Sequence, residues 1–495
     1  MRFQLAIFAI FLTCLAFSSI SSGVENDGHE IDHTGVVDED GAIDATEAEI
    51  IDDIQDETEE ISEAHDDTSV MGQHLQTQQT DIAAEPNSLS PARRHQLVTI
   101  KGDELPMLLG KSVDNYSVMA IKEGSFEPIP FQFDDMNKKG FPYVPGGRVP
   151  LKGLENIFEK NDELVFMLQD SGEKASKEQL TNIYGSVVAI LVLSDDMLTR
   201  YVYILEGNPL RSAKFYASYN QETGLIKTDF YSLQTRRKNI LDWSDLIYYS
   251  YSKDQSLLDT MKIRIKARLG PFKATIHNRV IPSNVMAVKN GPVRSLVSVD
   301  ISLSVFGVQL ANAGALMSFF ADGFSVPVFV QIPPIAGRLS DLTMNVSLDF
   351  NGLEGAKVMS ALGPKEPVTV GIGQGSDPDM LQVSLKHNWV TGTTEAGWDV
   401  IAFFTHSENF KPKLGLLFKD ASRGDKPDKP ERFSGSYPQI GYILKEIPVG
   451  EEIQFGIDVN FGDGFWQYGA GKSINEFKKP VTNTVFTLSQ VLADN

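Results

Sequence analysis

Cysteine is nearly absent from this 495-residue sequence, and basic residues are missing from one long stretch of it. The single cysteine is Cys14, so a scaffold stapled by intramolecular disulfides is excluded. Between Val24 and Ser90 there are 21 Asp or Glu residues and neither Lys nor Arg. The rest of the chain, from Pro91 to Asn495, carries 45 acidic and 43 basic residues, so it is nearly neutral. This balance excludes a strongly basic nucleic-acid-binding protein, and we expect no nucleic-acid partner.

Long hydrophobic runs are also scarce. The first is a 13-residue run from Leu5 to Phe17, which follows Arg2 and precedes the small residues Ser18 to Gly23. It is shorter than the roughly 20 residues that cross a bilayer, and this pattern predicts a signal peptide over residues 1–23 and no transmembrane span. The residues before Cys14 are a poor match to a lipid-modification site. We therefore expect an exported protein, located in a periplasm, on an outer cell surface or outside the cell.

The acidic stretch has no Phe, Trp or Tyr between Val24 and Ser90. A segment this polar cannot bury enough apolar area to offset the entropy of ordering it, so the composition predicts a disordered acidic tail over residues 24–95. A solubilising role is the simplest interpretation. Weak cation binding, or a removable pro-segment cut at Arg93-Arg94, are the alternatives.

The remaining 400 residues show mainly the period of two that is typical of β-strands, with frequent Gly and Pro between apolar stretches. This pattern predicts an all-β protein with a small N-terminal β barrel or sandwich at 96–208 and a larger β-sandwich or supersandwich at 209–495. A short helix is expected at Lys177–Asn182. The expected strands are 116–122, 128–133, 163–168, 187–194, 201–206, 261–269, 295–306, 326–332, 344–350, 368–372, 382–385, 400–406, 440–444 and 453–461.

One stretch of the larger domain is almost uncharged. From Ile301 to Gly337 the only charged residue is Asp322. Central strands covered on both faces explain such a composition. A membrane-inserting hairpin, or a surface that faces an envelope protein partner, are the alternatives.

A cluster of oxygen-bearing side chains follows the strand expected at 128–133. Asp134, Asp135 and Asn137 precede Gly140 in a pattern like the opening of a calcium loop, and Asp162 begins the next strand. Calcium takes six to eight oxygen ligands, so these four residues form a candidate metal site with calcium as its cofactor. Lys139 occupies a position that favours Asp or Asn, and an acidic hairpin turn without metal is the alternative.

A second cluster is cationic. The strand expected at 261–269 alternates cleanly and places four basic residues, Lys262, Arg264, Lys266 and Arg268, on one face. The aromatic residues Trp243, Tyr249 and Tyr251 lie shortly before it. Cations and aromatic rings together suit an acidic polysaccharide or other glycan, so these seven residues form a candidate ligand-binding site. Neutralisation by neighbouring acids, or docking of the chain's own acidic tail, are the alternatives.

A third candidate is the pair His277 and Arg279, which share a face if the strand continues through both. An arginine that neutralises a uronate carboxylate and a histidine that removes the C5 proton would suit a polysaccharide lyase. The sequence has no zinc-ligand spacing, nucleophile elbow or P-loop. The glycines Gly371, Gly373 and Gly375 are interpreted as a hairpin turn.

Three short motifs resemble an uncharacterised family of exported bacterial β-rich proteins. They are Pro128-Ile129-Pro130-Phe131-Gln132-Phe133-Asp134, Asn161-Asp162-Glu163-Leu164-Val165-Phe166-Met167 and Asn290-Gly291-Pro292-Val293-Arg294. The first two are similar to a small N-terminal barrel, and the third is similar to an element of polysaccharide-lyase supersandwich domains. The resemblance implies a secreted, multi-domain β protein and no particular reaction.

Together these patterns favour an exported, non-catalytic protein that binds an extended anionic or sugar ligand. A polysaccharide (uronate) lyase and a structural envelope component with a protein partner remain as alternatives.

Overall fold

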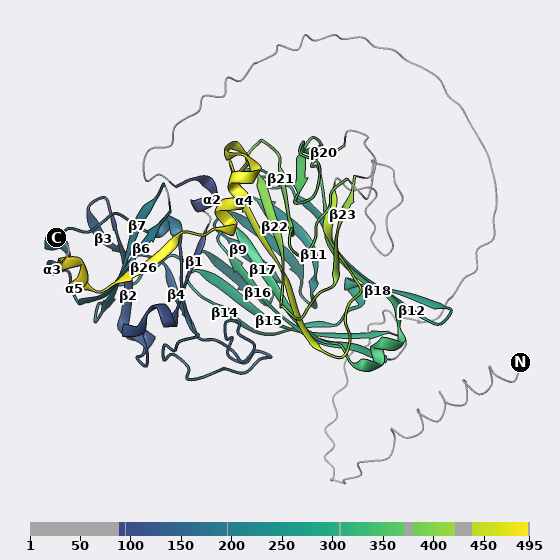
Figure 1. Ribbon diagram of the computed structural model, residues 1–495, viewed down its shortest axis with the longest axis horizontal. Coiled ribbons are helices and arrows are strands. Elements are labelled where there is room, and N and C mark those ends of the chain that lie inside the picture. The colour runs from purple at the N-terminus through teal and green to yellow at the C-terminus, as the bar shows by residue number, and fades with distance from the viewer. Residues whose placement is uncertain are drawn as a thin grey trace, which may run out of the picture. The chain divides into compact units, whose positions relative to one another are not determined.

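The computed structural model describes residues 89–94, 96–195, 197–305, 308–371, 380–420 and 438–493, and it confirms the all-β prediction (Figure 1). The described strands form five antiparallel sheets. The predicted signal peptide, most of the predicted acidic tail, Gly373 and Gly375 lie outside the described residues. The last residues of the predicted tail form a short helix, α2 (Pro91–Arg94). The described part of the chain therefore includes residues before the boundary at residue 95 that composition predicts.

The N-terminal part of the body contains two sheets. The three-stranded sheet has the order β1 (Leu97–Lys101), β5 (Glu163–Met167), β4 (Phe131–Asp134). The five-stranded sheet has the order β26 (Thr482–Phe486), β6 (Ser186–Ser194), β7 (Thr199–Glu206), β2 (Tyr116–Lys122), β3 (Ser125–Pro128). Tyr116, Phe158 and Phe166 are among the fully buried side chains between them. The predicted helix is present as α3 (Lys177–Asn182), where Ser176 and Gln179 form a capping box.

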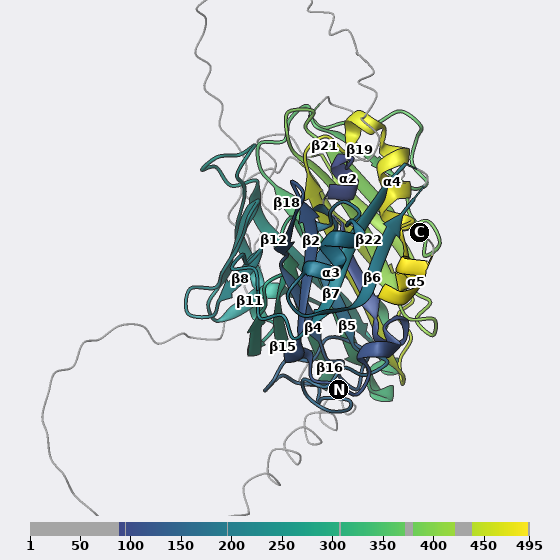
Figure 2. The same ribbon diagram turned by 90° about the vertical axis from the view of Figure 1, so that its left-hand side faces the viewer.

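The C-terminus returns to this N-terminal part. After α4 (Ala470–Lys478), strand β26 pairs with β6 in register from Thr482 to Phe486, and α5 (Leu488–Ala493) follows (Figure 2). Helix α2 adjoins α4. Arg93 of α2 donates to the Glu476 carbonyl at 3.1 Å, and the preceding Ser90 donates its Oγ to the Glu476 carboxylate at 2.5 Å. Residues more than 280 positions apart in the sequence therefore complete the same sheet.

Four consecutive strands then form a meander. They are β8 (Ala217–Asn220), β9 (Leu225–Thr228), β10 (Tyr231–Arg236) and β11 (Asn239–Tyr248). The basic run at residues 236–238 is the tip of the β10–β11 hairpin, which explains its polarity.

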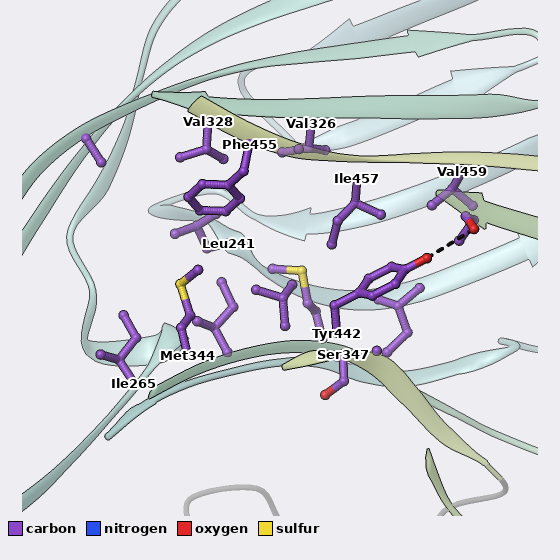
Figure 3. Close-up of a pocket in the computed structure, with 18 of the residues that line it drawn as sticks. Leu241, Ile265, Val326, Val328, Met344, Ser347, Tyr442, Phe455, Ile457 and Val459 are labelled. Atoms are coloured by element: carbon purple, nitrogen blue, oxygen red, sulfur yellow. Dashed lines mark hydrogen bonds between the residues drawn. The ribbon is translucent and has the colours of Figure 1, made fainter. Parts of the chain in front are cut away.

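The largest part of the molecule is a sandwich of two sheets. The smaller has the order β13 (Phe272–His277), β12 (Leu258–Leu269), β18 (Ser340–Phe350), β24 (Gln439–Lys445), β23 (Lys413–Lys419) and is called here the cationic sheet, for reasons given below. The larger has nine strands in the order β14 (Ser283–Asn290), β15 (Arg294–Val305), β16 (Val308–Phe320), β17 (Gly323–Gln331), β25 (Glu452–Gly462), β22 (Asp399–His406), β21 (Trp389–Thr393), β19 (Lys357–Ser360), β20 (Val368–Thr369). Alternate apolar residues of both sheets face one another between them (Figure 3).

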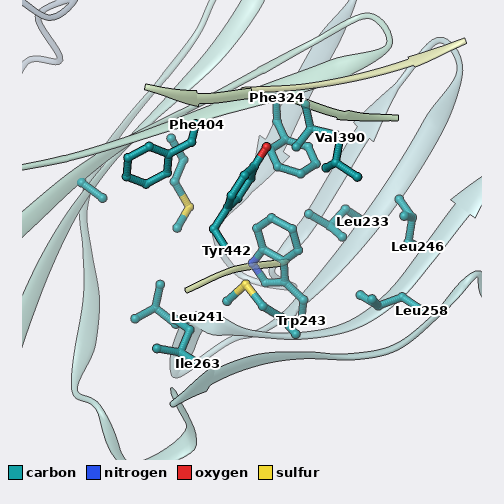
Figure 4. Packing of buried hydrophobic residues seen from close by; sticks show 14 of the residues in the cluster. Leu233, Leu241, Trp243, Leu246, Leu258, Ile263, Phe324, Val390, Phe404 and Tyr442 are labelled. Atoms are coloured by element: carbon teal, nitrogen blue, oxygen red, sulfur yellow. The ribbon is translucent and has the colours of Figure 1, made fainter. Parts of the chain in front are cut away.

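Aromatic residues fill one end of this sandwich. The Trp243 ring meets Phe324 edge-on at 5.2 Å between centroids (Figure 4). Phe461 also meets Phe324 edge-on, at 5.9 Å, and is tilted against Trp398 at 6.0 Å. Such contacts add to the burial of apolar area. Away from this cluster the packing between the sheets is looser, as described below.

The uncharged stretch 301–337 contains the whole of β16 and β17, which lie between other strands of the nine-stranded sheet. One face lines the sandwich interior. The other is covered by the segment after β4, where Phe141 stacks on Phe329 and Val144 packs against Leu316. Coverage on both faces accounts for the absence of charge. In the part of the chain that the structure describes, no helix is long and apolar enough to cross a membrane.

Most of the expected strands are present, but one is wrong and another is interrupted. The strand expected at 128–133 is broken at residues 129–130, between β3 and β4. Residues 382–385 form no strand, because Ser384 and His387 close a turn by exchanging backbone hydrogen bonds of 2.8 and 3.1 Å. The strand expected at 368–372 is limited to Val368–Thr369.

Candidate functional site

The four predicted cations of β12 lie on the outer face of the cationic sheet. The inward residues Met261, Ile263 and Ile265 belong to the core, and the basic residues alternate with them. Register extends this outer face across all five strands, since directly opposite residues of antiparallel strands share a face. One cross-strand row contains Thr275, Lys266, Thr343, Lys445 and Lys413.

This sheet is far more basic than the body around it. Its five strands contain eight Lys or Arg residues and three Asp residues. The basic residues are Lys262, Arg264, Lys266, Arg268, Lys273, Lys413, Lys419 and Lys445. The last four were not predicted as site residues. Lys273 and Lys445 stand singly in their strands, and Lys413 and Lys419 are the two ends of β23. No local pattern reveals that distant strands will place them beside β12.

Acidic neighbours neutralise part of this charge. Lys262 is 5% exposed and pairs with the buried Asp349 at 2.6 Å, while Arg268 pairs with Asp341 at 2.8 Å. Arg264 is 8% exposed and donates to the Ile263 carbonyl at 3.0 Å. Lys266, in contrast, is exposed, as are Lys273, Lys413 and Lys445. The accessible positive charge therefore lies at the end of the sheet that holds Lys266.

The predicted aromatic residues do not join this face. Trp243 is 3% exposed, and its Nε1 donates to the Ile240 carbonyl at 2.9 Å. Tyr251 packs against the main core and stacks on Trp398 at 6.4 Å. Tyr249 is 37% exposed beyond the end of β11 in the meander sheet. The combination of rings and cations predicted for a sugar ligand is therefore not assembled on the outer face.

His277 and Arg279 lie on different elements and have different neighbours. Strand β13 ends at His277, and Asn278–Val280 form a 3₁₀ turn, so the premise that one strand carries both residues is wrong. His277 lies opposite Arg264 in the register. Arg279 instead approaches Asp242, with 3.6 Å between the guanidinium and the carboxylate. The structure supplies no arrangement of this pair around a common substrate position.

Three motifs from distant parts of the sequence meet in one buried cluster, called here the Arg294 network. The Arg294 guanidinium donates to Asp134 at 2.7 and 2.9 Å and to Glu163 at 2.6 Å. Lys289 donates to Asp134 at 2.7 Å, and the Gln132 amide nitrogen lies 2.7 Å from the same carboxylate. The three motifs thus join the three-stranded sheet to the nine-stranded sheet.

The charges in this network hold one another ionised. Burial alone would raise the pKa of Asp134, but Arg294, Lys289 and the Gln132 amide outweigh it and hold that pKa below its usual range. Burial would lower the pKa of Arg294, yet the two carboxylates raise it. Gly291 permits the close approach, because a Cβ there would lie 2.0 Å from the Gln132 side-chain oxygen.

The other predicted calcium ligands hold the loop that follows β4. Asp162 accepts from the backbone amides of Met136 and Glu159 at 3.0 and 2.7 Å, and Asp135 accepts from Asn156 at 3.1 Å. The Asn137 side-chain oxygen accepts from Lys139 and Phe141.

These contacts use part of the oxygen set that calcium would need. Burial raises the pKa of Asp162 to about 6 despite its two amide donors. Within the described ranges, no group of three His, Cys, Asp or Glu residues is arranged to hold a metal ion. Calcium binding here stays a prediction.

The comparisons with known proteins give only distant similarity. No family model and no curated protein matches the chain. An α-mannosidase from Enterococcus faecalis V583 aligns with a TM-score of 0.43 and 9% identity, over 79% of this chain and 44% of that protein. The heparan sulfate lyase HepC from Pedobacter heparinus aligns with a TM-score of 0.29 and 10% identity, over 52% of this chain and 38% of the lyase.

A putative aldose 1-epimerase from Escherichia coli K12 aligns with a TM-score of 0.28 and 10% identity, over 50% of this chain and 98% of the epimerase. The similarity to β-sandwich parts of glycoside hydrolase, mutarotase and lyase structures is therefore real but remote. It assigns no family, and at these TM-scores it does not bear on function.

Proposed function

We propose that the protein is an exported, non-catalytic binder of an extended acidic polysaccharide, which lies along the outer face of the cationic sheet. The observation that carries this proposal is the net excess of five positive charges on five strands of a nearly neutral body. The predicted signal peptide supports the exported location.

The row of Lys266, Lys445 and Lys413 indicates that the ligand runs across the strands of the sheet. Adjacent strands are separated by about 4.8 Å, so these lysines repeat across the sheet at intervals that a linear chain with regularly spaced carboxylate or sulfate groups can follow. Thr343 lies between Lys266 and Lys445 and adds a hydroxyl to the row. Exposed ion pairs of this kind are individually weak, so affinity would come from several contacts and fall with salt.

The test reverses two accessible charges. Lys266→Glu with Lys445→Glu is expected to abolish retention of the protein on immobilised polygalacturonate and chondroitin sulfate at low salt. Both side chains are exposed, so the change tests binding with little effect on packing. The variant Arg264→Glu is less suitable, because that residue is buried.

The matched control is Lys177→Glu with Lys478→Glu, which makes the same change in net charge at exposed lysines of α3 and α4. This control should be retained almost as strongly as the unmodified protein. Equal retention of both double variants would contradict the proposal. Release of unsaturated uronides during these experiments would instead favour the lyase alternative.

A further inference from the structure

A second feature of the sandwich lies on the opposite side of the cationic sheet, in the interior. Between this sheet and the nine-stranded sheet is a cavity of about 260 Å³ (Figure 3). Apolar side chains enter it from both sides, among them Met344 from β18 and Val328 from β17. An apolar cavity of about 150 Å³ in another protein stays free of water and binds benzene, so this one has room for a larger hydrocarbon.

The residues that line the cavity extend both along the strands and across the nine-stranded sheet, from β15 to β19. Four successive inward positions of β18, from Leu342 to Leu348, line it, and so do four of β25, from Ile453 to Val459. Residues on the same face of a strand repeat every 6.6–6.8 Å, so four positions extend over about 20 Å. A volume of only about 260 Å³ that is spread over such an extent is thin, and it suits a flexible linear chain better than a rigid ring system.

The lining leaves a polar ligand without partners. Among its described residues, Thr391 donates its hydroxyl to the Val400 carbonyl at 2.8 Å, and the Ser347 hydroxyl lies 2.8 Å from the Gln439 amide. The Tyr442 hydroxyl is within 2.8 Å of the Asn388 carbonyl and 3.1 Å of the Ala402 carbonyl. A sugar or a charged group placed here would lose its hydrogen bonds to water without replacing them.

The packing around the cavity indicates that something fills it. Inner faces of packed sheets normally interdigitate, so side chains at central positions are fully buried. Here Val326, Val328, Met344, Phe455 and Ile457 are only partly buried, although they face the middle of the sandwich. An empty cavity of this size costs stability, because its lining forfeits dispersion contacts.

We propose that this cavity binds one unbranched hydrocarbon chain, supplied by a fatty acid or by an acyl lipid. The inference is independent of the polysaccharide proposal, because the two sites use opposite faces of β12 and β18. Filling the space restores the missing contacts, and the absence of free polar groups selects for the hydrocarbon part of the ligand.

The first measurement is a titration of the full chain with cis-parinaric acid, whose fluorescence rises in a dry environment. A saturable increase is expected, and its absence would overturn the proposal. Competition identifies the source of the chain: displacement by palmitate alone points to free fatty acids, and displacement by lysophosphatidylcholine as well points to acyl lipids in general. Saturable binding that neither competitor displaces would also overturn the proposal.

Variants then locate the site. Ala313 and Ala402 line the cavity from β16 and β22, and replacing both with Leu should weaken probe binding at least tenfold while the melting temperature stays equal or rises. Retained stability separates this result from simple unfolding. Thr405→Leu is the control, because Thr405 lies on β22 but is exposed on its other face.

If the double variant fails to fold, Val346→Phe tests the same space from β18. Unchanged probe affinity in a folded cavity-filled variant would overturn the proposal. The variant Lys266→Glu with Lys445→Glu should bind the probe like the unmodified protein, so failure of the polysaccharide proposal and failure of this one are distinguishable.

Discussion

At the scale of single residues, the contrast between buried and exposed charges decides which side chains hold the structure and which are available to a ligand. Asp134 is fully buried and meets Arg294 and Lys289, whereas Lys266 stands exposed at the surface. Both residues belong to motifs visible in the sequence. Composition cannot separate them, because burial depends on strands from elsewhere in the chain.

The first prediction concerns Asp134→Asn. Removing one partner from a buried ion pair leaves Arg294 poorly compensated, so the free energy of unfolding should fall by about 3–5 kcal/mol. Urea denaturation at pH 7 measures this change. Glu206→Gln is the control, since the exposed pair of Glu206 with Lys111 should contribute less than about 1 kcal/mol. Similar losses in both variants would contradict a special role for the Arg294 network.

The pH dependence of this effect has a definite sign. The pKa of Asp134 is lower in the folded protein than in the unfolded chain, where it is about 3.9. Its stabilising contribution is therefore fully present above pH 4 and is lost as the pH falls through the folded value. The difference between the unmodified protein and Asp134→Asn should shrink only in that acidic range.

The second prediction concerns Asp259, where the dependence of stability on pH has the opposite sign. Burial, followed by the nearby Asp349 carboxylate, raises the pKa of Asp259 to about 6 despite Lys262. The charged form is thus disfavoured in the folded state, and stability falls as the pH rises from about 4 to above 6. Asp259→Asn should raise the free energy of unfolding by about 1 kcal/mol at pH 7.5, after allowance for solvent screening, and leave it unchanged at pH 4. Urea denaturation at both pH values checks this, and a gain at pH 4 equal to that at pH 7.5 would refute it.

At the scale of elements, the sequence predicts what alternation can reveal. The strand at 261–269 is present within β12, because its apolar residues face the core at every second position. Strand β16 was missed as a separate element, since its small residues Ala311, Ala313 and Gly314 lack the bulk typical of strands. The error at 382–385 has a local cause, because Ser384 closes a turn with its own side chain and backbone.

The third prediction concerns β26, which no nearby sequence indicates. Ending the chain after Pro480 removes this strand and exposes the edge of β6, whose residues from Ile190 to Ser194 pair with it. We expect a lower melting temperature and concentration-dependent self-association, because an uncovered edge strand offers free backbone groups to another chain. Calorimetry and size-exclusion chromatography measure these effects. An unchanged melting temperature with a single monodisperse peak would show that β26 is dispensable.

At the scale of the whole described body, the candidate site could be predicted only in part. The cations of β12 are visible in the sequence, but Lys413 and Lys445 join them only through the order of strands in the sheet. The three family-like motifs were visible as well, yet their meeting around Arg294 depends on how the N-terminal sheets contact the nine-stranded sheet. No local sequence pattern predicts which distant strands will pair.

The contacts between the N-terminal sheets and the nine-stranded sheet indicate that the predicted domains at 96–208 and 209–495 do not unfold separately. Val165 and Met167 of β5 share a buried cluster with Tyr216, Val293 and Ala321 from the larger part. The loop after β4 also crosses the nine-stranded sheet, where Arg148 pairs with Asp300 and lies 2.8 Å from Asn312. Strand β26 completes the connection from the other end of the chain.

The fourth prediction is therefore a single cooperative unfolding transition of the full chain, with equal calorimetric and van't Hoff enthalpies. A fragment of residues 96–208 should not fold alone, since it lacks β26 and leaves Val165, Met167 and the Asp134 carboxylate without their partners. Scanning calorimetry tests the first statement, and circular dichroism of the fragment tests the second. Two separate transitions together with a folded fragment would mean that the Arg294 network joins two independent domains. A single transition would mean that the motifs at Gln132, Glu163 and Gly291 serve one shared core, on which the cationic sheet is supported.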